Sequence, residues 1–232
     1  KMLSASGTIL GIDSSTGACS IAVCRGGVVL AHLREEMTRG QSERLAPMAE
    51  TVLAAAGLGF PDLDVIAVTR GPGSFTGLRI GLAFAKGFGQ ALDIPVIGVT
   101  GFDAVARAVL STDGHAGSGV AVILESRRAD LFVQLFGPDG MDDGQPFALP
   151  PEEIAARLQQ HDRFPLMLAG DAADKVGAVL ESAGVSVGRS AVTAPDAREV
   201  ALIGLELGAG ADMPPPQPLY LRAPDVTAPR AG

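Results

Sequence analysis

A glycine-rich stretch in the first half of the chain, RGPGSFTGLR at residues 70–79, indicates the class of fold. An apolar run at Leu63–Thr69 precedes it and is typical of a buried strand, while residues 76–92 have the pattern of a helix. A strand, a glycine-rich turn and a helix in this order are typical of a layered α/β protein. The first turn of such a helix presents free N–H groups that can bind an anion.

The alternation of strands and helices extends in both directions from this stretch. Upstream, the pattern predicts three strands and a helix, at Thr8–Asp13, Cys19–Cys24, Val28–Glu35 and Ser42–Ala56. The Gly26-Gly27 pair predicts a hairpin, and Ser42 and Gly57 are the expected caps of the helix. Downstream, strands are predicted at residues 96–99, 120–124, 131–136 and 166–169, and helices at 102–110, 151–160, 172–183 and 196–208.

A segment rich in Gly, Ser and Asp at residues 111–118 divides the chain into two predicted lobes. We expect a first lobe at 2–110 and a smaller second lobe at 118–232, which ends in an irregular tail from residue 218. A chain of 232 residues is long enough for two small domains that each bury a core.

The composition narrows the functional class. Hydrophobic residues make up 47% of the chain and charged residues 19%, which fits a compact soluble protein. A net charge of -8, one tyrosine and no tryptophan make it a poor nucleic-acid binder by itself. No apolar run is long enough for a membrane span and no signal peptide is recognisable, so we expect no membrane association and a cytoplasmic location.

Several kinds of catalytic site have no candidate residues in the sequence. The three histidines, His32, His115 and His161, have no zinc-ligand spacing, and we expect each on the surface or in a loop. No Gly-x-Ser-x-Gly elbow is present. Cys19 and Cys24 form no CxxC pair and are expected to be small buried side chains. We therefore predict no catalytic residue and no metal site in this chain.

Two turns could bind an anion or a nucleotide. The first, at residues 11–17, ends a strand with an acid, small hydroxyl side chains and glycine; a tight turn in which Asp13 caps backbone amides is the alternative. The second, at residues 71–77, lacks the Gly-Lys-Ser/Thr ending of a Walker A loop and the spacing of a Rossmann fingerprint. The candidate residues are Asp13, Ser14, Gly71, Gly73, Thr76 and Gly77.

The helix at 76–92 carries two rows of small residues. Gly77, Gly81, Ala85 and Gly89 form one row at every fourth position, and Ala83, Gly87 and Ala91 form the other. Its three interior glycines each cost about 1 kcal/mol relative to alanine, so close contacts should compensate. The neighbour could be the protein's own sheet or a second chain, and two rows allow one to face inward and the other outward.

Several motifs together resemble the TsaB (YeaZ) family. They are residues 9–16 (ILGIDSST), 18–23 (ACSIAV), 70–79, 95–99 (PVIGV) and 218–222 (PLYLR). The resemblance is dense over residues 8–107 and thin from about 111 to 210. It implies the actin-like ATPase (ASKHA, ribonuclease H-like) fold with two lobes.

The resemblance also implies a function. It suggests a non-catalytic partner or dimerisation subunit in the synthesis of tRNA N6-threonylcarbamoyladenosine, working with a TsaD-like transferase and a TsaE-like ATPase. ATP and metal are then expected on the partner subunits and none in this one, tRNA is reached only through the complex, and the chain alone should be a homodimer. Its two first-lobe helices would form the subunit interface, for which the candidates are Leu45, Met48, Val52, Gly77, Ile80, Gly81, Phe84, Ala85 and Phe88.

The chain departs from the family at two places. Gln41 stands where relatives often keep a histidine, and the second lobe begins with Glu125-Ser126-Arg127-Arg128 instead of an Asp-Ala-Arg stretch. Two other functions remain open on sequence grounds. An ATP-dependent small-molecule kinase of the same fold would use Asp13 and the 71–77 loop, whereas a glycoprotein peptidase has neither metal ligands nor a nucleophile in this sequence.

Overall fold

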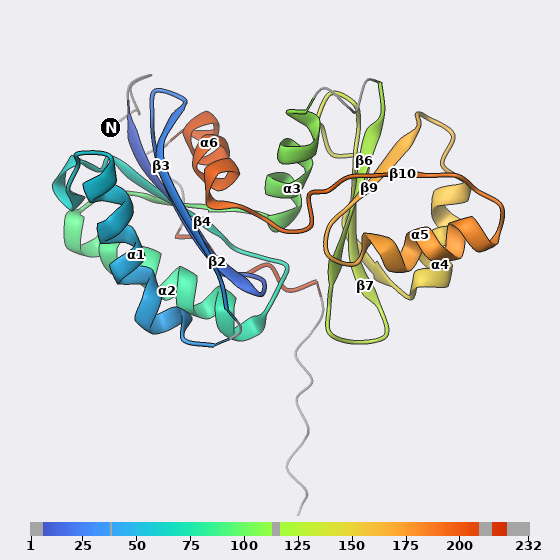
Figure 1. The fold of residues 1–232 in the computed structure, drawn as a ribbon, viewed down its shortest axis with the longest axis horizontal. Coiled ribbons are helices and arrows are strands. Elements are labelled where there is room, and N and C mark those ends of the chain that lie inside the picture. The colour runs from blue at the N-terminus through green and yellow to red at the C-terminus, as the bar shows by residue number, and fades with distance from the viewer. Residues whose placement is uncertain (1–6, 38, 113–116, 209–214, 222–232) are drawn as a thin grey trace, which may run out of the picture.

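The computed structural model describes residues 7–37, 39–112, 117–208 and 215–221, which form two lobes that each contain a five-stranded sheet (Figure 1). The first sheet has the order β3-β2-β1-β4-β5. Its strands are β1 (Thr8–Asp13), β2 (Ala18–Arg25), β3 (Val28–Glu36), β4 (Val65–Thr69) and β5 (Val96–Val99). β1 pairs antiparallel with β2 and parallel with β4, so it lies at the centre of the sheet. All six residues of β1 are buried.

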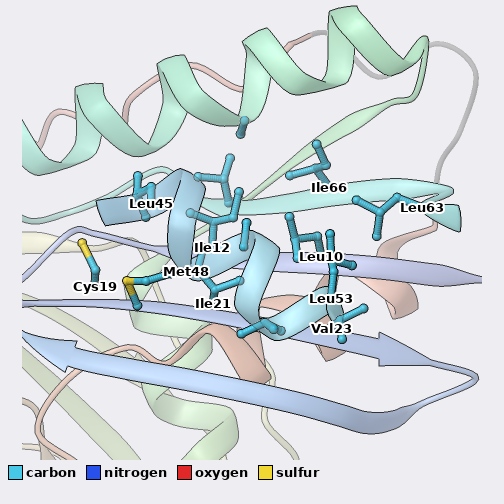
Figure 2. Close-up of a cluster of buried hydrophobic side chains, with 14 of the residues drawn as sticks. Leu10, Ile12, Cys19, Ile21, Val23, Leu45, Met48, Leu53, Leu63 and Ile66 are labelled. Carbon is cyan, nitrogen blue, oxygen red and sulfur yellow. The ribbon is translucent and has the colours of Figure 1, made fainter. Parts of the chain in front are cut away.

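Helices cover both faces of the first sheet. On one face lie α1 (Gln41–Ala55) and α2 (Phe75–Leu92), side by side in Figure 1. Apolar side chains of α1 fill the space above β1, β2 and β4, as Figure 2 shows for Leu45, Met48 and Leu53. The opposite face packs against α6 (Ala197–Leu207), which contributes Val200 and Ala201 to a second buried cluster.

The position of α6 corrects the predicted domain division. The boundary at 111–118 assigned residues 196–208 to the second lobe, but α6 packs on β1, β2 and β4 of the first lobe. Its first residue is fixed there, because the Ala197 amide donates to Ser20 Oγ at 2.9 Å. A Cβ placed on Gly11 would lie 2.2 Å from the Ala197 carbonyl oxygen, so this glycine in β1 permits the close approach of the helix. The second lobe is therefore an insertion before the last helix of the first lobe.

The second lobe repeats the layered arrangement on a smaller scale. Its sheet has the order β10-β9-β6-β7-β8. The strands are β6 (Gly119–Glu125), β7 (Leu131–Phe136), β8 (Phe147–Leu149), β9 (Leu166–Ala169) and β10 (Gly188–Arg189). Side chains of α4 (Pro151–Gln159) and α5 (Ala173–Ser182) pack on one face. The other face meets α3 (Gly101–Leu110), whose Phe102 and Val105 are buried beside Val120 and Val122.

The predicted strands and helices are observed, with ends that shift by a residue or two. Gly26 and Gly27 form the predicted hairpin with φ of 59° and 82°. Ser42 is not the N-cap of α1; Gly40 caps it in a left-handed conformation, without a side-chain hydrogen bond. Gly57, with φ 68°, directly follows the C-cap Ala56. The prediction missed three short elements, η1 (Phe60–Asp62), β8 and β10.

None of the helices in the described part of the chain is long and apolar enough to span a membrane. Of the tail predicted to be irregular, residues 218–221 are described and form neither helix nor strand, whereas 222–232 lie outside the described residues.

Candidate functional site

The turn after β1 and the turn before α2 contact each other directly. Ser74 N donates to the Ser15 carbonyl oxygen at 2.7 Å, and Ser14 Oγ donates to the Gly77 carbonyl oxygen at 2.9 Å. Ser74 caps α2, because its Oγ accepts from Gly77 N at 3.4 Å. These bonds join the turn that contains Asp13 and Ser14 to the turn that contains Gly73 and Gly77, which are four of the predicted anion-site residues. Of the other two, Gly71 lies against Leu219, and Thr76 is exposed.

Glycine is required at this contact for steric reasons. A Cβ on Gly73 would lie 2.3 Å from the Ser15 carbonyl oxygen, and one on Gly77 would lie 2.1 Å from the Ser14 carbonyl oxygen. The protein's own backbone thus fills the space in front of both glycines. A phosphate bound there would require the two turns to separate, so the residues as arranged do not fit a nucleotide phosphate at Gly73 or Gly77. Anion binding by these residues stays a prediction.

Asp13 is completely buried at the end of β1. Its Oδ1 accepts from Ser15 Oγ at 2.6 Å and from Ser15 N at 3.2 Å, as the turn interpretation expects. Among the residues that the structure describes, its Oδ2 has no hydrogen-bond partner. Burial raises the pKa of the carboxyl group above its ordinary value, and the bonds from Ser15 oppose that shift only in part. No group of three or more His, Cys, Asp or Glu side chains in the described ranges is placed to hold a metal ion.

Asp13→Asn is expected to make stability less dependent on pH. A carboxyl group whose pKa is raised by folding contributes most to stability below its unfolded pKa, and that contribution is lost as pH rises through the folded value. The variant should therefore gain in melting temperature relative to the parent from about pH 4 upward, with the largest gain at pH 8. Thermal unfolding between pH 4 and 8 measures this, with Asp162→Asn at an exposed position as the control. If the melting temperature of the parent rose relative to that of the variant as pH increases, the raised pKa of Asp13 would be contradicted.

The two small-residue rows of α2 face opposite directions. Gly77, Gly81, Ala85 and Gly89 are buried. A Cβ on Gly81 would lie 2.5 Å from Ser14 Oγ, and one on Gly89 would lie 2.4 Å from a methyl group of Val96. By contrast, Ala83, Gly87 and Ala91 are exposed, and within the described part of the chain a Cβ on Gly87 would have no contact closer than 4 Å. The inward row accommodates the protein's own strands and turns, and the outward row presents a small-residue surface.

Most of the predicted interface residues are therefore core residues. Leu45 and Met48 are 0% exposed and Val52 is 2% exposed, because the apolar stripe of α1 packs on the sheet. Gly77, Gly81 and Ala85 belong to the inward row of α2 and are buried as well. These six cannot contact another chain in this conformation. Ile80, Phe84 and Phe88 are half-buried against the same core, with the ring centroids of Phe84 and Phe88 4.5 Å apart.

The surface of α1 and α2 that faces away from the sheet is composed of small and polar residues. We call it the outer face; its exposed members include Pro47, Glu50, Thr51 and Ala54 of α1 and Thr76, Arg79, Ala83, Gly87, Gln90 and Ala91 of α2. Figure 1 shows the two helices lying along one side of the first lobe, away from the second lobe. The small side chains allow another helix to approach closely here.

An exposed aromatic pair, missed in the sequence, borders the outer face. Phe75 and Tyr220 are 52% and 45% exposed, and their ring centroids lie 5.9 Å apart. The guanidinium carbon of Arg79 lies 3.9 Å from the centroid of Phe75. Leu219 N donates to the Arg70 carbonyl oxygen at 2.7 Å, which holds the 218–221 segment beside the turn. The motif at 218–222 indicated that this segment is important. Its contact with Phe75 could not be predicted, because the two residues are far apart in the sequence.

Of the two histidines within the described residues, one lies on a strand and the other in a loop. His32 lies on β3, with Nε2 3.1 Å from Asp196 Oδ1. His161 lies in a loop as predicted, but only 9% of its side chain is exposed, and Nε2 is 3.0 Å from Asp143 Oδ2. His115 lies outside the described residues.

Cys19 and Cys24 are buried and free, as expected, and burial raises the pKa of each thiol to about 12.

Comparison with known proteins relates the sequence to tRNA-modification proteins. Residues 25–138 match the family model described as TsaD: tRNA N6-adenosine threonylcarbamoyltransferase. The tRNA threonylcarbamoyladenosine biosynthesis protein TsaB of Bacillus subtilis (strain 168) is 30% identical over 230 residues, which cover 95% of this chain and 96% of the relative. TsaB of Haemophilus influenzae is 36% identical over 125 residues, 54% of this chain and 52% of the relative. The chain thus spans about half the length of the latter.

Solved structures resemble most of the chain, and two of them show how far the likeness extends. An uncharacterized Pseudomonas aeruginosa protein with similarity to peptidase YEAZ has a TM-score of 0.76 at 28% identity, covering 93% of this chain and 100% of that one. Component A of the Acidaminococcus fermentans (R)-2-hydroxyglutaryl-CoA dehydratase has a TM-score of 0.51 at 13% identity, covering 87% and 99%, which is a likeness of fold alone.

Two sheets of five strands with helices on both faces place the chain in the actin-like ATPase, ribonuclease H-like class of folds. In this chain the glycine-rich turn at residues 71–77 packs directly against the turn at residues 13–15. The match over nearly the full length of the Bacillus subtilis protein identifies the family: this chain belongs to the TsaB family.

Proposed function

We propose that this chain is a partner subunit, without a catalytic site of its own, in the synthesis of tRNA N6-threonylcarbamoyladenosine. It docks through the outer face of α1 and α2 onto a TsaD-like transferase, which belongs to the family whose model matches residues 25–138. A TsaE-like ATPase completes the assembly. In the absence of the transferase, the same face pairs two copies of the chain.

The outward small-residue row on α2 carries this proposal. Gly87 costs about 1 kcal/mol relative to alanine in a helix interior, yet a Cβ built on it would meet no atom of the described residues outside its own helix turn within 4 Å, so packing within the described part of the chain does not explain a glycine there. A contact with a second backbone would explain it, because only a small residue lets two helices approach closely. The exposed Phe75, Arg79 and Tyr220 extend the same surface with the residue types that are frequent in protein interfaces.

The chemistry is assigned to the partner because this chain offers few groups for it. The turns that would hold a nucleotide are closed on each other, which also argues against the small-molecule kinase. The region corresponding to the metal-binding histidines of TsaD-like proteins, residues 40–45, contains no histidine, and Gln41 is buried. With a net charge of -8, the chain is poorly suited to bind tRNA directly, so tRNA is held through the complex.

Association with the TsaD-like protein of the same organism tests the proposal. Gel filtration with light scattering should show one stable complex of the two chains, and a dimer when this chain is alone. Transfer of threonylcarbamoyl to tRNA should require the transferase and be absent with this chain alone. Failure of the two chains to associate, with and without nucleotide, would disprove the docking role. Turnover by the isolated chain would disprove the assignment of chemistry to the partner.

A further inference from the structure

Residues 216–221, which follow α6 in the chain, run along the first lobe toward the second, and we call them the strap. Figure 1 shows this segment, in red, between the two sheets. Pro216 is buried against Gly98 of the edge strand β5, because a Cβ placed on Gly98 would lie 2.7 Å from Pro216 Cβ. Leu219 N donates to the Arg70 carbonyl oxygen at 2.7 Å. Both contacts fix the strap to the first lobe.

The end of the strap lies at the junction between the lobes. Leu221 packs against the buried cluster that α3 forms with the sheet of the second lobe. The glycine-rich turn reaches the same junction, since the Gly71 carbonyl oxygen accepts from Gly101 N at 2.8 Å. A Cβ on Gly101 would lie 3.5 Å from the Pro72 carbonyl oxygen and 3.6 Å from a methyl group of Leu124 in β6. The strap therefore connects the turn of the first lobe to the core of the second.

Tyr220 brings the strap to the border of the outer face. Its side chain is 45% exposed, and its ring centroid lies 5.9 Å from that of Phe75. The residue before it is bonded to the first lobe, and the residue after it packs at the lobe junction. Consecutive Cα atoms are held about 3.8 Å apart, so a displacement of Tyr220 must move Leu219, Leu221 or both.

The strap adds a contact between the lobes where the rest of the chain permits a hinge. The polypeptide passes between the lobes after α3 and again before α6. Relative motion is expected of two lobes unless the contact between them is extensive and apolar. A segment bonded to one lobe and packed at its end against the core of the other opposes such motion.

We propose that residues 216–221 couple the border of the outer face to the angle between the two lobes. While Tyr220 stacks on Phe75, Leu221 stays packed at the junction and the lobes keep one arrangement. Displacement of Tyr220 releases Leu221 and lets the lobes rock. The coupling is a property of the free chain, so its test does not depend on the proposed function.

Distances between spin labels on the two lobes, measured by double electron–electron resonance, test the strap in the full chain. Val28→Cys on β3 and Ala156→Cys on α4 provide one exposed site in each lobe, while Cys19 and Cys24 are buried. An excess of unlabelled chain ensures that only distances within one molecule contribute. The parent should give one narrow distribution. Leu221→Ser should broaden it and extend it to longer distances, because the anchor at the junction is lost.

Tyr220→Ala tests the coupling itself, since it removes only a half-exposed ring at the border of the outer face. It should broaden the distribution as Leu221→Ser does, whereas Gln217→Ala, at an exposed position of the strap, should leave it unchanged. Melting temperatures report that each variant is folded. A parent distribution that is already broad, or one that stays narrow in folded Leu221→Ser, would show that the strap does not hold the lobes. A narrow distribution in Tyr220→Ala, or equal broadening in Gln217→Ala, would refute the coupling.

Discussion

Gly87→Arg is expected to weaken binding to the TsaD-like partner by about a hundredfold or more without lowering the melting temperature of the chain. Gly87 is exposed on α2, and a Cβ placed on it would meet no atom of the described residues within 4 Å. Arginine therefore fits the free protein, but its long charged side chain occupies the space that a docked helix needs. A hundredfold loss corresponds to about 2.7 kcal/mol, which is typical of a residue near the centre of an interface.

The measurement is isothermal titration of each variant with the partner. Gly87→Ala is the first control and should retain most of the affinity, because it keeps a small side chain on the outer face. Ala156→Arg is the second control, since it makes a comparable change at an exposed position on α4 in the other lobe. Gly87→Arg that binds as tightly as both controls would place the interface elsewhere. The same loss in Ala156→Arg would point to an effect of charge alone.

Gly77→Leu should lower the free energy of unfolding by about 3 kcal/mol or more, whereas Gly87→Leu should not lower it. Both glycines lie in α2, and leucine is a better helix former than glycine at either position. At Gly77 the new Cβ would lie 2.1 Å from the Ser14 carbonyl oxygen, so the turn after β1 must move and its bonds to α2 must break. At Gly87 the side chain extends into open space.

Thermal and urea unfolding of the two variants measure this difference. For a chain of this length, the loss at Gly77 corresponds to about 6 °C or more in melting temperature. Each variant is the control for the other, because both replace glycine with leucine in α2 and only the face of the helix differs. Equal melting temperatures for both variants would mean that the contact between the turns is not important for stability. A lower melting temperature in Gly87→Leu alone would mean that Gly87, and not Gly77, lies on the inward face of α2.

The sequence predicted most of the fold because its local patterns are strong. Alternating strands and helices, the Gly26-Gly27 hairpin and the RGPGSFTGLR turn each follow from short-range rules. The two rows of small residues in α2 were also visible. Which row faced inward could not be read from the helix, because the deciding contact comes from Ser14, more than sixty residues earlier.

The candidate site was harder to predict because it depends on long-range contacts. The apolar stripe of α1, including Leu45 and Met48, indicates only a buried face, and assigning it to an interface followed the family resemblance instead of the periodicity. The contact between Phe75 and Tyr220 joins residues that are far apart in the chain. The same is true of the placement of α6, since its amphipathic pattern does not specify which sheet it covers.

The return of α6 to the first sheet has a consequence for the order in which the protein can be completed on the ribosome. All five strands of that sheet are synthesised before residue 100, but one of its faces stays uncovered until the Ala197–Leu207 segment emerges. Until then, Ile9, Val65 and Ala67 lack the helix that buries them in the folded protein. The second lobe is synthesised in between and can fold as a unit, so the first lobe, whose strands come earlier in the chain, completes its core after the second lobe.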